Sequence, residues 1–197
     1  MSAAVIADIS VSLDGFVTGP DPDLEHGLGI GGEPIHTWAL DPDEVDEVAI
    51  DEGMAAGAVI QGRKLFDIID GPKGWNDEMG YGAARAGQPQ IVVVTHQAPE
   101  NPRLTKGFHF ETGGIEAAVE RARSLAGDKP VVIMGGAEVI RSALAANLVH
   151  VLKLHLAPVL LGSGTPLFTA DSPRPQLVQS KVLVSSHATH LTYTVAG

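Results

Sequence analysis

One feature most constrains the fold that this sequence can adopt. It is a strand-like run that ends in a glycine pair and continues as a helix. Residues 131–134 are apolar and typical of a buried strand, Gly135 and Gly136 follow, and residues 137–141 read as a helix. Because glycine has no side chain, the backbone N–H groups at the start of such a helix are open to a ligand. The positive end of the helix then suits a phosphate or diphosphate. A simple tight turn explains the same pair, and the segment alone leaves both interpretations open.

Two further segments follow the same logic. Gly62 and Arg63 come directly after a short buried run, where glycine allows a close backbone approach and a guanidinium suits phosphate. Thr95 and His96 end the β-branched run at 91–95 and offer a hydroxyl, an imidazole and backbone donors for a phosphate or ribose. Taken singly, Arg63 could instead form a surface ion pair, and Thr95 and His96 could instead form a polar turn after the strand.

The order of the elements predicts an α/β fold. Alternating strands and helices favour a mostly parallel sheet covered on both faces, and the last two strands predict an antiparallel hairpin at its edge. Ligands of such sheets bind at the carboxyl ends of the strands, where the three segments lie. We find no repeat or linker, so residues 1–197 are expected to form one domain. Strands are expected at 5–13, 16–17, 58–61, 91–95, 108–111, 131–134, 149–156, 177–185 and 189–195, and helices at 43–56, 64–69, 113–126 and 137–146, with long loops at 19–33 and 71–87.

Composition excludes several classes of function. The formal net charge of −11, with only 13 Lys and Arg, argues against nucleic acid or an anionic membrane as partner. The absence of Cys excludes disulfides, thiolate metal sites and cysteine nucleophiles. The first residues lack a basic export signal, and no apolar run approaches the roughly 20 residues of a membrane span. A cytoplasmic location is therefore expected.

Familiar catalytic and metal-binding motifs are missing. The chain has no GxGxxG, no GxxxxGK[ST], no HExxH and no Gly-x-Ser-x-Gly. We predict no metal site, and we expect surface or structural roles for the scattered histidines His26, His36, His109, His150, His155, His187 and His190.

Five motifs occur in an order that resembles the dihydrofolate-reductase-like superfamily. More closely, they resemble the branch that contains the reductase domain of the bifunctional riboflavin-biosynthesis protein. The motifs span residues 5 to 168, and the last is the most specific. They are Ser12-Leu13-Asp14-Gly15-Phe16-Val17, Gly62-Arg63-Lys64-Leu65-Phe66, Val92-Val93-Val94-Thr95-His96, Met134-Gly135-Gly136 and Leu156-Ala157-Pro158-Val159-Leu160-Leu161-Gly162-Ser163-Gly164-Thr165-Pro166-Leu167-Phe168.

The resemblance implies a mixed, mostly parallel sheet flanked by helices, with NADPH bound at the strand ends. By likeness, the adenosine-side phosphates would lie near Gly62, Arg63 and Thr95, with His96 close to the 2′-phosphate. The diphosphate would lie at the helix start formed by Gly135, Gly136, Ala137 and Glu138. Substrate would be bound by the turn Asp14, Gly15 and Phe16 and by Leu160 and Gly162 of the opposing loop.

The resemblance also implies a reaction. It is hydride transfer from NADPH to a C=N or C=O carbon of a small heterocyclic or sugar-derived substrate, as in 5-amino-6-(5-phosphoribosylamino)uracil reductase. Two residues are candidates for a catalytic role. Asp46 lies on the helix before the Gly-Arg strand, although acids in a first turn usually face solvent. Asp14 is the second candidate, although Asp-Gly is also a common turn dipeptide.

Several alternatives remain open. The zinc deaminase domain that usually accompanies the riboflavin enzyme is not in this sequence, and residues 19–42 match neither parent enzyme in any way that we can place. Dihydrofolate reduction would need an acid that reaches the pterin. The chain could instead be a non-catalytic dimeric nucleotide-binding module, and a flavin or deazaflavin could replace NADPH. By analogy we expect a homodimer.

Overall fold

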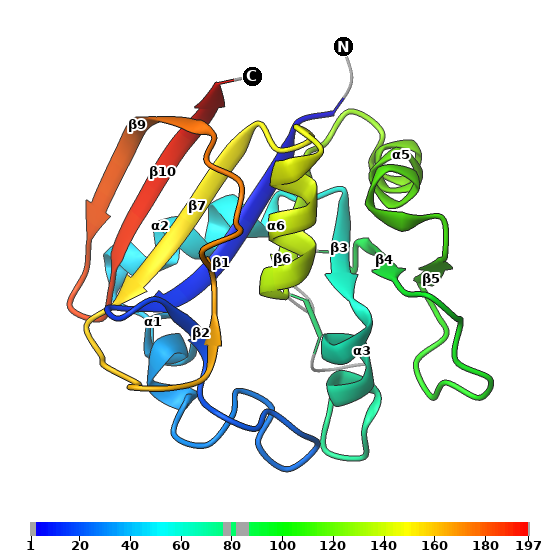
Figure 1. Ribbon diagram of the computed structural model, residues 1–197, viewed down its shortest axis with the longest axis horizontal. Helices are drawn as coiled ribbons and strands as arrows, with labels where there is room; N and C mark the ends of the chain where they lie inside the picture. Colours follow the sequence, from blue (N-terminus) through cyan, green and yellow to red (C-terminus); the bar gives the residue numbers. More distant parts are fainter. Residues whose placement is uncertain (1–2, 77–79, 82–86, 197) are drawn as a thin grey trace.

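One eight-stranded sheet runs through the molecule (Figure 1). The computed structural model describes residues 3–76, 80–81 and 87–196. The strand order is β5-β4-β3-β6-β1-β7-β10-β9. All neighbours from β5 to β7 are parallel, and β10 is antiparallel to both β7 and β9. The strands are β1 Val5–Ser12, β3 Ala58–Gly62, β4 Gln90–Val94, β5 Phe108–Glu111, β6 Val131–Gly135, β7 Val151–Ala157, β9 Gln176–Val184 and β10 Thr189–Ala196.

Helices cover both faces of this sheet. α5 (Gly114–Ala126) and α6 (Ala137–Ala145) lie on one face, and α2 (Glu44–Met54) lies behind the sheet in Figure 1. The short helices η1 (Glu33–His36) and α1 (Thr37–Leu40) precede α2, and α3 (Arg63–Asp70) follows β3. No helix among the described residues is long and apolar enough to cross a membrane.

The two faces of β1 differ in chemistry. Val5, Ala7 and Val11 are buried in the apolar core against α5 and α6. Ser10 and Ser12 are also buried but point the other way, because successive side chains alternate across a strand. A parallel strand buried on both faces is normally apolar throughout, so polar residues here indicate a polar layer under α1 and α2.

The fold class and the antiparallel C-terminal hairpin are confirmed, with three corrections. The second strand does not resume the first: β2 (Phe16–Thr18) pairs with β8 (Thr165–Pro166) in a separate two-stranded sheet. Residues 33–40, expected in no element, form η1 and α1. The helix at 43–56 is present, but the apolar stripe that Val45, Val48 and Ala49 predict is only partly buried. Ala49 is buried and Val48 is 45% exposed, whereas Asp46, Ile50 and Gly53 are buried as well.

Candidate active site

The three predicted phosphate-binding segments lie side by side at one edge of the sheet. β3 is parallel to both β4 and β6, and Gly62 is in register with Val94 while Gln61 is in register with Gly135. Parallel neighbours end at the same edge, so the segments that follow these strands face one region.

The start of α6 is open. Gly136 caps the helix without a side-chain hydrogen bond, and a methyl group placed on it would meet no atom within 4 Å. A methyl on Gly62 would lie 3.0 Å from Val139 Cγ2 and 3.9 Å from the Gly136 nitrogen. The peptide bond between Gly135 and Gly136 is cis. Ala137 is buried and Glu138 is exposed in the first turn. The free amides of this nine-residue helix therefore fit an anionic group.

Arg63 lies across the end of β4. Its Nη1 donates to the Gln97 carbonyl oxygen at 2.8 Å and reaches Thr95 Oγ1 at 3.5 Å, and its Nε donates to Asp67 at 2.6 Å. The buried Thr95 hydroxyl also donates to the Gln97 carbonyl oxygen, and His96 is exposed. The Arg63 side chain is 37% exposed, so its cationic fork can meet a ligand at this edge.

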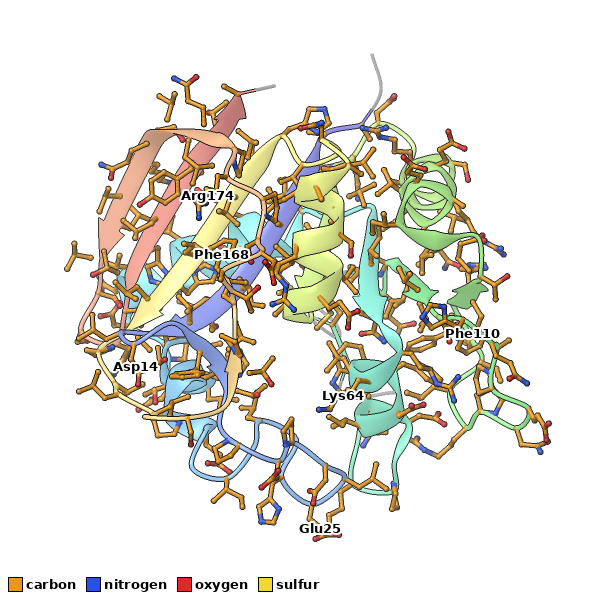
Figure 2. The ribbon with its side chains drawn as sticks, viewed as in Figure 1. Asp14, Glu25, Lys64, Phe110, Phe168 and Arg174 are labelled. Carbon is orange, nitrogen blue, oxygen red and sulfur yellow. The ribbon has the colours of Figure 1, made fainter. Side chains whose placement is uncertain are left out.

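Asp14 anchors the loop at 158–164. Its carboxylate accepts hydrogen bonds from the backbone N–H groups of Leu161 at 3.1 Å and Gly162 at 2.7 Å, and from Ser12 Oγ at 2.5 Å. The Ser12 hydroxyl and then the Gly162 amide lower the pKa of Asp14, so it stays ionised at neutral pH. Figure 2 shows Asp14 at the turn between β1 and β2, with Lys64 on α3 across the same edge of the molecule.

The other predicted substrate-side residues belong to the same turn and loop. Gly15 has a φ of 91°, and its carbonyl oxygen accepts from the Leu167 N–H at 2.9 Å. The Phe16 N–H donates to Ser12 Oγ, and Leu160 is exposed on the loop. The structure therefore gathers Asp14, Gly15, Phe16, Leu160 and Gly162.

Arg141 joins this group to the phosphate-binding side. It extends from α6, and its Nη1 donates to the carbonyl oxygens of Pro166 and Leu167, each at 3.0 Å. Leu167 in turn bonds Gly15, so one guanidinium ties the open helix to the turn beside β1.

Asp46 lies apart from these residues, inside the molecule. The expectation that the acids of its turn face solvent is wrong for this residue, which has no exposed surface. Its Oδ2 accepts from the Asp43 N–H and from His187 Nδ1, each at 3.0 Å, and its Oδ1 lies 2.9 Å from His190 Nε2. Burial raises the pKa of Asp46, but hydrogen bonds from Ser185, the Asp43 amide and the two histidines outweigh this and lower it overall.

Asp43, Asp46 and His187 offer three ligand atoms within 4.8 Å of one another. The two carboxylates are already engaged by α2 amides, by Ser186 and by the histidines. This internal hydrogen bonding explains the cluster without an ion.

Sequence reasoning missed the meeting of His155 and His190. Their Nδ1 atoms lie 2.7 Å apart, and the Trp38 ring stacks on His155 with centroids 4.0 Å apart. The two residues are directly opposite in the β7–β10 ladder. Only that register brings them together, and no local motif in the sequence reveals it.

Comparison with known proteins agrees with this architecture. The family model of the RibD C-terminal domain matches residues 3–191. The uncharacterized protein YyaP of Bacillus subtilis (strain 168) is 23% identical over 171 residues, which are 83% of this chain and 79% of YyaP.

Solved structures show the same fold. A protein of Shewanella sp. PV-4 that is provisionally assigned to riboflavin biosynthesis superimposes with a TM-score of 0.69 at 20% identity, over 98% of this chain and 99% of that one. The Thermotoga maritima diaminohydroxyphosphoribosylaminopyrimidine deaminase/5-amino-6-(5-phosphoribosylamino)uracil reductase gives a TM-score of 0.63 at 14% identity, over 99% of this chain and 57% of the bifunctional one. Enterococcus faecalis dihydrofolate reductase, solved with NADP(H), gives 0.61 at 13% identity over the whole of both chains.

The fold therefore places the molecule in the dihydrofolate-reductase-like class of α/β proteins. Within that class, the chain belongs to the RibD C-terminal domain family, and its function is reductase-like.

Proposed function

We propose that this protein is an NADPH-dependent reductase of a small heterocyclic or sugar-derived substrate, with a reaction resembling that of 5-amino-6-(5-phosphoribosylamino)uracil reductase. The observation that carries the proposal is the open start of α6 beside Gly62, with Arg63 at the neighbouring strand end. Membership of a reductase-domain family and the likeness to an enzyme solved with NADP(H) support it.

The residues present fit a phosphorylated dinucleotide. The N–H groups at Gly136 and Ala137 can hold the diphosphate, because no side chain fills the space in front of them. Arg63 can pair with the adenosine-side phosphate, with Thr95 and His96 beside it. In a chain of net charge −11, such a local cation is needed to bind an anion. The bound cofactor would supply the hydride, and the protein would bind, orient and exclude water.

The turn and loop near Asp14 fit the substrate side. Asp14 holds the loop at Leu161 and Gly162, so its first role is to position that loop. Its exposed, ionised carboxylate can also accept a hydrogen bond from a substrate hydroxyl. The full engagement of Asp46 inside the molecule argues against a pterin-protonating role and so against dihydrofolate as the substrate.

Calorimetric titration with NADPH, NADH and a flavin nucleotide tests the cofactor. We expect micromolar binding of NADPH and weak binding of NADH. Arg63→Ala should weaken NADPH binding by about 10- to 100-fold, the loss expected for a charged hydrogen bond, and should change NADH binding little. Arg121→Ala, which removes an exposed arginine from α5, is the matched control.

Equal losses for the two nucleotides would show that Arg63 does not contact the 2′-phosphate. Absence of NADPH binding, or tighter binding of the flavin, would overturn the cofactor assignment. NADPH binding without oxidation by any substrate in a screen would favour the non-catalytic module.

We also propose that the protein is a cytoplasmic homodimer. The outer strand β9 carries exposed apolar side chains at Leu177, Val178, Val182 and Val184, which supports self-association at this edge. Sedimentation velocity should show a dimer for the native chain and a monomer for Val182→Glu; a monomeric native chain would refute the proposal.

A further inference from the structure

A continuous chain of four titratable side chains crosses the sheet beneath α2. Asp8 Oδ1 on β1 lies 2.7 Å from His155 Nε2 on β7. His155 Nδ1 lies 2.7 Å from His190 Nδ1 on β10, and His190 Nε2 lies 2.9 Å from Asp46 Oδ1 on α2. These are hydrogen-bond distances, so each of the three contacts needs one hydrogen between its two heavy atoms.

Counting those hydrogens fixes the charge of the chain. Two neutral imidazoles carry two ring hydrogens, and two carboxylates carry none. Three contacts therefore need one proton more than this set supplies. The count does not depend on where each proton sits, because moving one along a hydrogen bond leaves the total unchanged. With three hydrogens, the four side chains carry a net charge of −1 instead of −2.

We propose that this chain, which we call the His155–His190 relay, is a buried proton-binding site that holds one extra proton at neutral pH. The proton is shared by two imidazoles that lie between two carboxylates. Its loss would leave one of the three contacts without a hydrogen, so that either two nitrogen lone pairs face each other at 2.7 Å or a nitrogen lone pair faces a carboxylate oxygen.

Burial makes the relay a defined site. The side chains of His155 and His190 are 4% and 5% exposed, and Asp46 is fully buried. A cavity of about 10 Å³, room for roughly one water, lies beside the two rings. The second carboxylate oxygen of Asp46 bonds His187, whose side chain is 26% exposed, and the Asp8 side chain at the other end of the relay is 15% exposed, so both ends of the relay reach solvent.

The surrounding charges are mixed. Burial lowers the pKa of His190, the Asp46 carboxylate opposes this, and a charged His155 lowers it again, so the pKa of His190 lies below its ordinary value and a second proton on the pair is disfavoured. The other titratable groups around the relay are Glu52 and Asp43 from α2 and its cap, Lys153 on β7, Lys181 on β9, His36 on η1, His187 at the hairpin, and Tyr81. Glu52 is paired with both lysines, so those three groups together carry a formal charge of +1.

Trp38 reports on the site directly, because it stacks on His155 and an imidazolium quenches indole fluorescence. The only other tryptophan is Trp75, so Trp75→Phe leaves one reporter. We expect emission to rise in a single one-proton transition above pH 6.5, the ordinary histidine value. His155→Gln should abolish the transition, and His26→Gln, in an exposed loop, should leave it unchanged.

Nitrogen-15 NMR of the native protein is the second measurement and needs no variant to fold. At pH 7 we expect three protonated ring nitrogens among the four of His155 and His190. Two protonated nitrogens, or a Trp38 transition at or below the ordinary histidine pKa, would overturn the proposal. Neither readout depends on the reductase assignment.

Discussion

Asp46→Ala tests the interior position of Asp46 most severely. The substitution removes an acceptor for three hydrogen bonds, from the Asp43 N–H, His187 and His190. At about 1–1.5 kcal/mol for each bond, the loss is about 3–4.5 kcal/mol. That range agrees with the roughly 3–5 kcal/mol observed when one partner of a buried charged pair is removed.

The matched control is Glu44→Ala in the same helical turn. Glu44 is exposed, so the change removes only a favourable interaction with the helix dipole, about 0.3–1 kcal/mol. Asp46→Asn retains one acceptor oxygen, so its loss of stability should lie between those of Asp46→Ala and Glu44→Ala. Urea unfolding at pH 7 gives all three values, provided that the denaturant slope is unchanged.

The difference in the free energy of unfolding between the native protein and Asp46→Ala should also depend on pH. The pKa of Asp46 is lowered in the folded state, so its contribution is complete above about pH 4, the ordinary aspartate value, and is lost as pH falls through the folded pKa. A loss below about 1 kcal/mol at pH 7, or equal losses for Asp46→Ala and Glu44→Ala, would refute the reasoning from buried hydrogen bonds.

Two further substitutions test other parts of the structure. Gly164→Ala should lower the melting temperature far more than Gly162→Ala. A methyl on Gly164 would lie 1.9 Å from the Thr18 carbonyl oxygen, whereas a methyl on Gly162 would meet nothing within 4 Å. Similar melting temperatures for the two variants would contradict this packing. Burial, with a smaller effect of His155, lowers the pKa of His36 to about 4. The unfolded chain therefore binds more protons between pH 4 and about 6.5, and stability should fall as pH decreases through that range. His36→Asn should flatten the fall in melting temperature, and an unchanged slope would contradict the assignment.

The strand ends could be predicted because their signals are local. Gly62-Arg63, Thr95-His96 and Gly135-Gly136 each follow a short apolar run, and parallel pairing then brings them to one edge. The two candidate acids were harder to judge from sequence. Both patterns, Asp-Gly in a turn and acids in a first helical turn, have a local explanation, and tertiary contacts decide the role of each side chain.

The polar layer under α2 could not be predicted for two reasons. Acids in a first helical turn usually face solvent, so the sequence predicts an outward Asp46, whereas the helix buries it. The meeting of His155 with His190 depends on the register of two strands that are 35 residues apart. Register follows from the whole sheet, and no spacing along the chain specifies it.

The histidine pair also has a consequence for assembly of the chain. β10 inserts between β7 and β9, and a slip of one residue would turn His190 to the opposite face of the sheet. His155 and Asp46 would then each lose a buried partner, which is far more costly than losing an apolar contact. The two imidazoles thus favour the native register of the C-terminal strands, because a hairpin docked one residue out of register would leave buried polar groups unpaired.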